Sequence, residues 1–288
     1  MAERSQAVLI TGCSTGIGRS TAERLARAGK VVYATARSEE AVEDLRAAGC
    51  HTLALDVCDE ASMSAAVERV VAEQGAVAEQ GAVGVLVNNA GYSQSGAIET
   101  VAMGDVRRQF ETNVFGLIRM SQLVLPGMRA QRWGRIVNVS STGANSTFPG
   151  GGIYHATKYA VEAVSDALRF EVKGFGVGVI VIQPGLIRSR FGETAATAVE
   201  QGEGPYAAFN ASAARATTEV YEKGPLARLG GDPDDVARAI EKATARRSPR
   251  IRVRVTPSAH MLVAQRRMMT VGLWDRFLAT QFPRPGEG

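Results

Sequence analysis

Seven short runs of Val, Ile, Leu and Ala alternate with longer stretches of helical periodicity, and this alternation limits the fold more than any other feature. Most of the runs are nearly continuously apolar, which is typical of strands covered on both faces of a parallel sheet. The strand-like runs span residues 7–11, 31–36, 52–56, 83–88, 135–140, 177–183 and 250–255, and the helical patterns span 17–29, 39–48, 60–73, 104–131, 154–173 and 233–246. We therefore predict a doubly wound α/β fold, with a seven-stranded, mostly parallel sheet and helices on both faces.

Length and composition restrict the class of protein. The chain has 288 residues, of which 45% are hydrophobic and 22% charged, which excludes a disordered chain and favours one domain over residues 1–288. No apolar run reaches the roughly 20 residues of a membrane helix, and strand-like sequence begins too early to leave room for a signal peptide. Three cysteines cannot all pair within one chain, which indicates a cytoplasmic location. The net charge of only +4 argues against nucleic acid as a partner.

One short repeat interrupts the pattern. The hexapeptide VAEQGA occupies residues 71–76 and recurs letter for letter at 77–82. Repeat architectures need periods of about 20 residues or more, so this is a tandem duplication between a helix and the fourth strand. Because it joins that strand at its N-terminal end, away from the edge where open α/β sheets bind ligands, we expect it to be functionally silent.

A glycine-rich loop connects the first strand to the first helix. It reads Thr11-Gly-Cys-Ser-Thr-Gly-Ile-Gly18. Gly12 permits a tight turn, Gly16 lets the backbone approach a pyrophosphate, and Gly18 lets the helix pack closely on the strand. The free N–H groups and positive dipole end of the helix then face the phosphates, which predicts a dinucleotide site. For Cys13, a small residue that fits the loop is favoured over a redox-sensitive thiol.

A second set of motifs carries chemistry. Tyr154 and Lys158 are four residues apart, so on a helix their side chains share one face. Ser141 ends the fifth strand thirteen residues before the tyrosine, and Asn113 lies in a helical stretch. A Tyr-Lys pair alone is common on helix surfaces, but these motifs in this order after the glycine loop point to a catalytic site.

The Gly-x-x-x-Gly-x-Gly loop with this Asn–Ser–Tyr–Lys set resembles the short-chain dehydrogenase/reductase family in its single-domain form. The resemblance is strong over residues 6–190. It implies a Rossmann-type fold and an oxidoreductase that transfers a hydride between a nicotinamide cofactor and a carbonyl or alcohol, with no metal. The strings VYATAR at 32–37 and TGCSTGIG at 11–18 favour the hydroxysteroid and retinol dehydrogenase branch.

The resemblance also implies a role for each catalytic residue. Tyr154 is the general acid in reduction and the base in oxidation, and Ser141 polarises the substrate oxygen. Lys158 lowers the tyrosine pKa and holds the nicotinamide ribose, while Asn113 supports a water chain to Lys158. Ser140 competes with Ser141, but the family spacing selects Ser141. His155 is interpreted as structural or pocket-lining.

The cofactor contacts follow from the same resemblance. NAD-preferring relatives have an acidic residue at the end of the second strand, where this chain has Ala36 followed by Arg37. A guanidinium can bind a 2′-phosphate, so NADP(H) is favoured over NAD(H). Ser189 replaces the usual Thr and keeps the hydroxyl. The expected cofactor-binding residues are Thr11, Gly12, Ser14, Thr15, Gly16, Ile17, Gly18, Arg37, Asp56, Val57, Asn89, Ala90, Gly91, Tyr154, Lys158, Pro184, Gly185, Ile187 and Ser189.

The resemblance divides the chain by role. Residues 6–185 form the cofactor-binding and catalytic core, 186–230 a substrate lid, 258–282 a C-terminal substrate or interface segment, and 283–288 a disordered tail. Apolar residues in the two later segments predict a hydrophobic ketone, aldehyde or alcohol as substrate. An acyl or polyketide ketoreductase is a close alternative, and a non-catalytic NADP(H) sensor or a sugar-nucleotide epimerase are more distant ones.

Assembly is expected as well. The helices at 104–131 and 154–173 carry apolar residues on more than one face, which suggests buried helices or a subunit interface. The residues are Leu117, Met120, Val124, Val161, Val164 and Leu168. Family members commonly pair these two helices, so we expect a homodimer or homotetramer.

Overall fold

The computed structural model describes residues 4–75, 81–189, 204–222 and 227–286. Within them the chain forms a seven-stranded sheet in the order β3-β2-β1-β4-β5-β6-β7. Every neighbouring pair is parallel, so the predicted doubly wound α/β fold is confirmed. The strands are β1 (Val8–Ile10), β2 (Val32–Ala36), β3 (His51–Ala54), β4 (Val85–Asn88), β5 (Gly134–Val139), β6 (Val177–Pro184) and β7 (Arg252–Val255).

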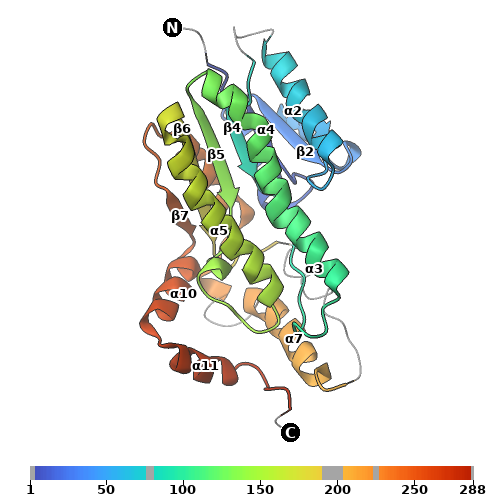
Figure 1. Cartoon of the computed structure of the whole chain (residues 1–288), viewed down its shortest axis with the longest axis vertical. Helices are drawn as coiled ribbons and strands as arrows, with labels where there is room; N and C mark the ends of the chain where they lie inside the picture. Colours follow the sequence, from blue (N-terminus) through green and yellow to red (C-terminus); the bar gives the residue numbers. More distant parts are fainter. Residues whose placement is uncertain (1–3, 76–80, 190–203, 223–226, 287–288) are drawn as a thin grey trace.

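Helices cover both faces of the sheet (Figure 1). One face packs against α1 (Gly16–Arg27) and α9 (Pro233–Ala245), and its core includes Leu25 and Ile240. The other packs against α2 (Glu60–Gly75), α4 (Gly116–Ala130) and α5 (Gly152–Val172), and its core includes Val67 and Met120. Burial on both faces explains why the strands are continuously apolar.

The predicted helix at 104–131 is confirmed, but it is not α-helical throughout. It consists of α3 (Met103–Phe110), one π-helical turn at Glu111–Phe115 and then α4. The pattern at 39–48 is also different, because it forms a 3₁₀ helix at Glu40–Ala48. Apolar periodicity alone does not distinguish these geometries from an α-helix, since their side-chain spacings are similar over one or two turns.

The later segments of the chain gather at the end toward which the strands point (Figure 1). They are α7 (Ala207–Glu222), α10 (Pro257–Met268) and α11 (Val271–Ala279). Residues 190–203 and 223–226 of the predicted lid, and 287–288 of the predicted tail, lie outside the described residues. In the part of the chain that the structure describes, no helix is long and apolar enough to cross a bilayer.

Several helices begin with recognisable sequence signals. Asp232 and Asp235 form a reciprocal capping box at the start of α9, with Pro233 in its first turn. The Thr256 and Thr270 side chains accept backbone N–H bonds at the starts of α10 and α11. The Thr256 cap starts α10 directly after the end of β7, and the Thr270 cap starts α11 shortly after α10 ends.

The duplicated hexapeptide lies partly outside the described residues, which resume at Gly81. Gly75 ends α2, and a Cβ on Gly75 would lie 3.8 Å from the Cα of Gly81, so the two glycines are neighbours in space. Ala82 follows and is buried just before β4, at the N-terminal end of the sheet.

We predict that deleting residues 77–82 leaves turnover and cofactor affinity nearly unchanged. After the deletion, Gly75 and Ala76 precede Val83 as Gly81 and Ala82 do now, and the closeness of Gly75 to Gly81 lets the shorter chain connect. Closure entropy changes little, because even doubling a loop costs only about 0.6 kcal/mol. Steady-state kinetics and a thermal melt test this. A tenfold loss of turnover in a folded protein would contradict it.

Candidate active site

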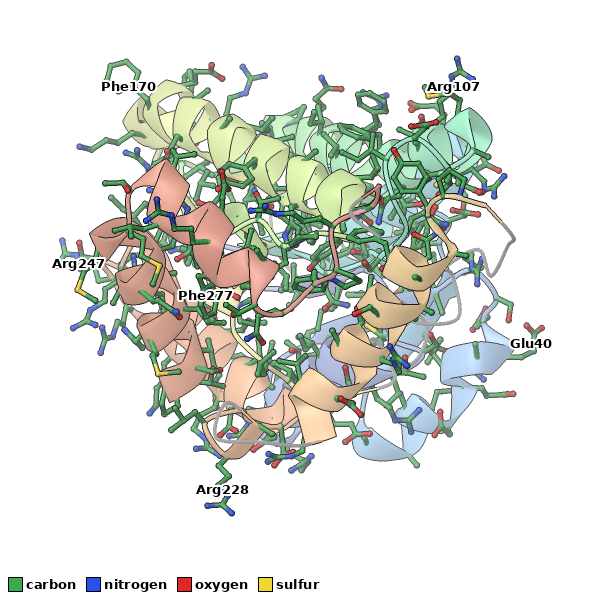
Figure 2. The ribbon with its side chains drawn as sticks, turned by 90° about the horizontal axis from the view of Figure 1, so that it is seen from below. Glu40, Arg107, Phe170, Arg228, Arg247 and Phe277 are labelled. Atoms are coloured by element: carbon green, nitrogen blue, oxygen red, sulfur yellow. The ribbon has the colours of Figure 1, made fainter. Side chains whose placement is uncertain are left out.

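A cavity of about 1650 Å³ opens at the C-terminal ends of the strands. Loops after β1, β2, β4, β5 and β6 line it, together with residues of α7, α10 and α11. Figure 2 looks at this end of the molecule and shows α7 and α11 on opposite sides of it. Ligands of open α/β sheets bind at this edge, and the sequence-predicted site residues from distant segments meet here.

The glycine loop has the geometry that its sequence predicts. Gly12 and Gly16 have φ values of +74° and +60°, a region in which side chains are strained. A Cβ on Gly12 would lie 2.9 Å from the Ala90 Cα, and one on Gly18 would lie 2.2 Å from the Gly12 carbonyl oxygen. Glycine is therefore required for the close packing of this loop, and the N-terminus of α1 faces the cavity.

Thr11 and Gly18 are predicted cofactor residues that support the loop without lining the cavity. The Thr11 hydroxyl oxygen accepts hydrogen bonds from the backbone N–H groups of Asn89 and Ala90, each at 3.0 Å. The Asn89 side-chain amide donates to the carbonyls of Thr11 and Gly12 at 2.9 and 3.0 Å. These bonds join the loops after β1 and β4. Thr11 and Gly18 thus shape the binding surface, while Gly12, Ser14, Thr15, Gly16, Ile17, Asn89, Ala90 and Gly91 line it.

The cavity is also lined by the predicted cofactor-binding residues that follow β2 and β3. Ala36 is buried there, and Arg37 is exposed and lines the cavity. Asp56 and Val57 also line it. The Asp56 carboxylate accepts a 2.9 Å hydrogen bond from the Cys58 N–H, so it also closes its own turn. At the end of β2 the surface therefore carries the positive charge of Arg37, and the preceding Ala36 supplies no carboxylate.

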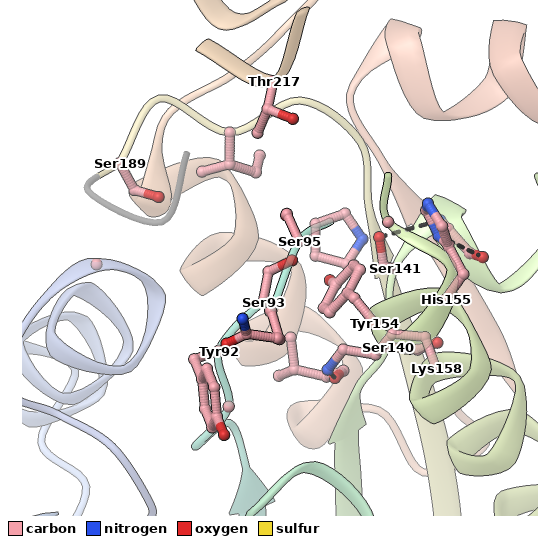
Figure 3. A pocket seen from close by; sticks show the side chains of 18 of the residues that line it. Tyr92, Ser93, Ser95, Ser140, Ser141, Tyr154, His155, Lys158, Ser189 and Thr217 are labelled. Carbon is pink, nitrogen blue, oxygen red and sulfur yellow. Dashed lines mark hydrogen bonds between the residues drawn. The ribbon is translucent and has the colours of Figure 1, made fainter. Parts of the chain in front are cut away.

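Tyr154 and Lys158 project from α5 into the middle of the cavity (Figure 3). The Lys158 Nζ lies 5.7 Å from the centre of the Tyr154 ring and donates a 2.9 Å hydrogen bond to the Val139 carbonyl. Burial lowers the pKa of Lys158 to about 8, partly opposed by the charge of Glu162. A desolvated ammonium beside the ring favours a phenolate over a phenol, as the sequence-based role of Lys158 requires.

Ser141 and Ser140 are separated by the geometry. Ser141 lines the cavity next to Tyr154 (Figure 3), and its Oγ accepts a 3.0 Å hydrogen bond from the Gly143 N–H. Ser140 also reaches the cavity, but it is 3% exposed, and its hydroxyl has no hydrogen-bond partner among the described residues. The more accessible Ser141 is the better placed of the two to meet a substrate.

Asn113 is not in the wall of the cavity. It sits in the π-helical turn, where its amide donates to the Tyr92 carbonyl at 2.9 Å and to Thr157 Oγ1 at 3.1 Å, and its Oδ1 accepts from the Tyr92 N–H. A Cβ on Gly91 would lie 3.0 Å from this Oδ1 and 3.8 Å from the Lys158 Nζ. The absent side chain of Gly91 leaves space between Asn113 and Lys158, which suits the predicted water chain.

The loop after β6 closes the cavity on another side. Its residues Pro184, Gly185, Ile187 and Ser189 line the cavity. Gly185 donates a backbone hydrogen bond to Val255, and Ile187 forms a bridge with Gly231. A Cβ on Gly16 would lie 3.9 Å from that of Ser189, so this loop faces the glycine loop.

Known proteins share this arrangement. A family model described as short chain dehydrogenase matches residues 6–200. The 3-ketodihydrosphingosine reductase of Bacteroides thetaiotaomicron is 36% identical over 261 residues, which cover 90% of this chain and 91% of that protein. This chain belongs to the short-chain dehydrogenase family.

Solved structures agree. A short-chain dehydrogenase from Streptomyces avermitilis is 33% identical with a TM-score of 0.76, and the match covers 96% of this chain and 95% of that one. A serine dehydrogenase complexed with NADP⁺ is 27% identical with a TM-score of 0.70, covering 88% and 95%. The predicted family is therefore confirmed. The preference for the hydroxysteroid and retinol branch stays a prediction.

Other parts of this dehydrogenase reach the cavity without any sequence motif. Ser93 and Ser95 follow β4, and Phe148 follows β5. The C-terminal helices and the residues after them add Met261, Leu262, Phe277 and Phe282. The predicted substrate role of 258–282 is consistent with this placement, but the single residues could not be chosen in advance, because only the packing of α10 and α11 decides which side chains face inward.

Two residues beside the motifs have strongly shifted pKa values. Burial raises the pKa of the Cys13 thiol to about 12, which supports the small-residue interpretation over a reactive thiolate. Burial lowers the pKa of His155 to about 4, although its bond to Gly143 acts in the opposite direction. His155 lines the cavity, as predicted, and is neutral near pH 7.

The His155 shift predicts a pH dependence of stability. The unfolded chain, with a histidine pKa near 6.5, binds more protons than the native state between about pH 6.5 and 4, so native stability is lost as the pH falls through this window. The free energy of unfolding of the natural protein should fall relative to that of His155→Phe, by up to about 1.4 kcal/mol per pH unit. Urea titrations at pH 7, 6, 5 and 4.5 measure this difference. A constant difference would contradict the shift.

Proposed function

We propose that this chain is an NADP(H)-dependent oxidoreductase that interconverts a hydrophobic ketone or aldehyde and its alcohol. The observation that carries the proposal is the convergence of Ser141, Tyr154 and Lys158 in one cavity whose other end is the glycine cradle. The cradle fits a dinucleotide, because a Cβ on Gly12 or Gly18 would collide with neighbouring backbone, and the start of α1 offers N–H groups to a pyrophosphate.

The chain's own residues handle the proton. When bound, NADP(H) supplies the hydride. Tyr154 donates a proton to the carbonyl oxygen in reduction and removes it in oxidation. A phenol with a pKa of about 10 is a poor base near neutrality, so the neighbouring Lys158 ammonium is needed to favour the phenolate. Ser141 donates a hydrogen bond to the same oxygen and stabilises the charge that develops on it.

The preference for NADP(H) depends on Ala36 and Arg37. A carboxylate at this position would repel a 2′-phosphate, whereas the exposed Arg37 guanidinium can bind it. Arg37 makes no ion pair with a described residue, so it is available for a ligand. The relative whose structure contains NADP⁺ supports the same assignment.

The substrate is inferred from the lining of the cavity. Phe148, Met261, Leu262, Phe277 and Phe282 supply apolar surface to the cavity that Tyr154 also lines. Such a wall suits a hydrophobic carbonyl compound. Similarity to a 3-ketodihydrosphingosine reductase supports a hydrophobic ketone. An acyl or polyketide ketoreductase remains the close alternative, and the epimerase alternative is set aside by the family membership.

A non-catalytic NADP(H) sensor is the alternative from another class. A broken catalytic set would favour it, but the sequence keeps Asn113, Ser141, Tyr154 and Lys158. NADPH oxidation against steroid, retinoid, aliphatic and acyl ketones distinguishes the two. Turnover of a hydrophobic ketone supports the enzyme, and tight NADPH binding without turnover on any of them supports the sensor.

We also propose a cytoplasmic homodimer or homotetramer. The residues that suggested helix pairing include Leu117, Met120, Val124 and Val161, but these are buried within the chain and belong to its core. Other apolar side chains on the same helices do point outward, namely Phe115, Tyr159 and Phe170. Phe170 is 82% exposed and projects from the edge of the molecule (Figure 2). These residues are the better candidates for pairing.

We predict that Tyr154→Phe abolishes reduction while NADPH binding survives. The ring and its packing remain, and only the proton donor is lost. Acid–base catalysis typically contributes 10²–10⁴-fold. Turnover with excess enzyme and NADPH fluorescence titration measure the two effects. Residual activity within about tenfold of the natural enzyme would contradict the assignment.

We predict that Arg37→Asp weakens NADPH binding and narrows or reverses the preference over NADH. A hydrogen bond to a charged group contributes about 1.5–3 kcal/mol, which corresponds to roughly 10–150-fold in affinity. Dissociation constants of both cofactors for both proteins measure this, with Arg37→Gln as a control that removes the charge only. A natural enzyme that already prefers NADH would overturn the cofactor assignment.

A further inference from the structure

His155 follows the proposed catalytic tyrosine but has no part in the proton transfer described above. Its ring is 9% exposed and contacts the Tyr154 ring edge-on, with 5.6 Å between ring centres. Phe148 packs on another side, at 6.1 Å between ring centres. A buried imidazole beside the reacting groups needs a hydrogen-bond partner, and its partner indicates what it does.

Two hydrogen bonds connect His155 to Ser141 through Gly143. The His155 Nδ1 lies 3.0 Å from the Gly143 carbonyl oxygen, and the Gly143 N–H donates to Ser141 Oγ, also at 3.0 Å. Figure 3 shows both as dashed lines. A carbonyl can only accept, so Nδ1 must carry the proton of the first bond. The imidazole therefore acts as a donor here.

Packing holds Gly143 between the two side chains. A Cβ on Gly143 would lie 2.4 Å from the His155 Nδ1 and 3.4 Å from the Ser141 Oγ. Any side chain at residue 143 would displace the imidazole. Gly143 also lies in a short 3₁₀ turn, Thr142–Ala144, which Ser141 caps. The His155 ring therefore packs against the 3₁₀ turn whose Gly143 N–H donates to Ser141.

We propose that His155 is a positioning residue that sets the direction in which the Ser141 hydroxyl donates its hydrogen bond. A serine hydroxyl has one hydrogen and two lone pairs. The Gly143 N–H occupies one lone pair, so the hydroxyl hydrogen must point away from Gly143 and can reach a substrate oxygen in the cavity. His155 holds Gly143 in the orientation that this requires.

The state of the imidazole suits this role. Its pKa is lowered to about 4 by burial, so the ring is neutral near pH 7, and the bond to the Gly143 carbonyl places its one N–H proton on Nδ1. The proposal rests on the proposed function, because Ser141 must be the group that polarises the substrate.

The first test compares His155→Leu with His155→Asn. The two new side chains have nearly the same shape, but only asparagine can donate to the Gly143 carbonyl. We expect leucine to lower kcat about tenfold, the equivalent of one hydrogen bond of about 1.4 kcal/mol, with asparagine within about threefold of the natural enzyme. The dissociation constant for NADPH should change by less than about twofold in both. Equal losses in the two variants would overturn the proposal, since shape alone would then matter.

A double-mutant cycle identifies the residue through which His155 acts. In a Ser141→Ala background, His155→Leu should lower kcat by less than about twofold further, because its target is already absent. A full additional tenfold loss would overturn the proposal. If the leucine variant does not fold, His155→Phe takes its place in the comparison with His155→Asn. Phenylalanine keeps an aromatic ring but cannot donate to the Gly143 carbonyl.

Different experimental results would overturn the role of His155 and the proposed function. Full activity of Ser141→Ala would remove Ser141 from the mechanism and overturn the role of His155, whereas a natural protein that turns over no ketone would overturn the proposed function. A large loss in Ser141→Ala, together with a fully active His155→Leu enzyme, would overturn the role of His155 and leave the proposed function intact.

Discussion

The close contact between the start of α1 and the loops after β1 and β4 is the constraint on which the site depends. A Cβ on Gly18 would lie 2.2 Å from the Gly12 carbonyl oxygen and 2.5 Å from the Asn89 amide, so the helix could not begin where it does with any larger residue. Because Gly18 lets α1 pack this closely, the first N–H groups of the helix face the cavity. The bonds of Thr11 and Asn89 then tie the loop after β4 to the same place. This arrangement of free N–H groups supports the proposed phosphate site at the start of α1.

Close packing also shapes the part of the cavity that contains Tyr154 and Lys158. Lys158 is buried beside Tyr154, and its ammonium donates a hydrogen bond to the Val139 carbonyl at the end of β5. Burial disfavours the charge and makes its effect on the neighbouring phenol stronger, because the local dielectric is low. Gly91 leaves room between Lys158 and Asn113, and Gly143 leaves room for His155. Glycines outside the phosphate loop therefore shape this site as much as the motif residues do.

Much of the fold and site could be predicted because the relevant signals are local. The continuous apolar strands indicate a parallel sheet, and parallel strands bring all their C-terminal ends to one edge. Motifs that follow different strands, such as Thr11–Gly18 and Ser141, must then meet. The helix spacing of Tyr154 and Lys158 places both on one face. By contrast, the π-helical turn within the helix at 104–131 was not predicted, because it adds one residue without disturbing the apolar pattern enough to be visible.

By itself, the sequence determined the order of the strands and helices along the chain, the conformation of the glycine loop and the four-residue spacing of Tyr154 and Lys158 on one helix, since each depends on spacing within a few turns or on the conformational freedom of glycine. Only the tertiary structure decided which residues share the cavity across the chain. It brought Phe148 next to Trp274, placed Met261 and Phe277 against the substrate end, and set Gly143 between Ser141 and His155. It also showed that Leu117 and Val161 are core residues while Phe170 is exposed. These outcomes depend on how α5, α10 and α11 pack, and packing between distant segments leaves no periodic trace in the sequence.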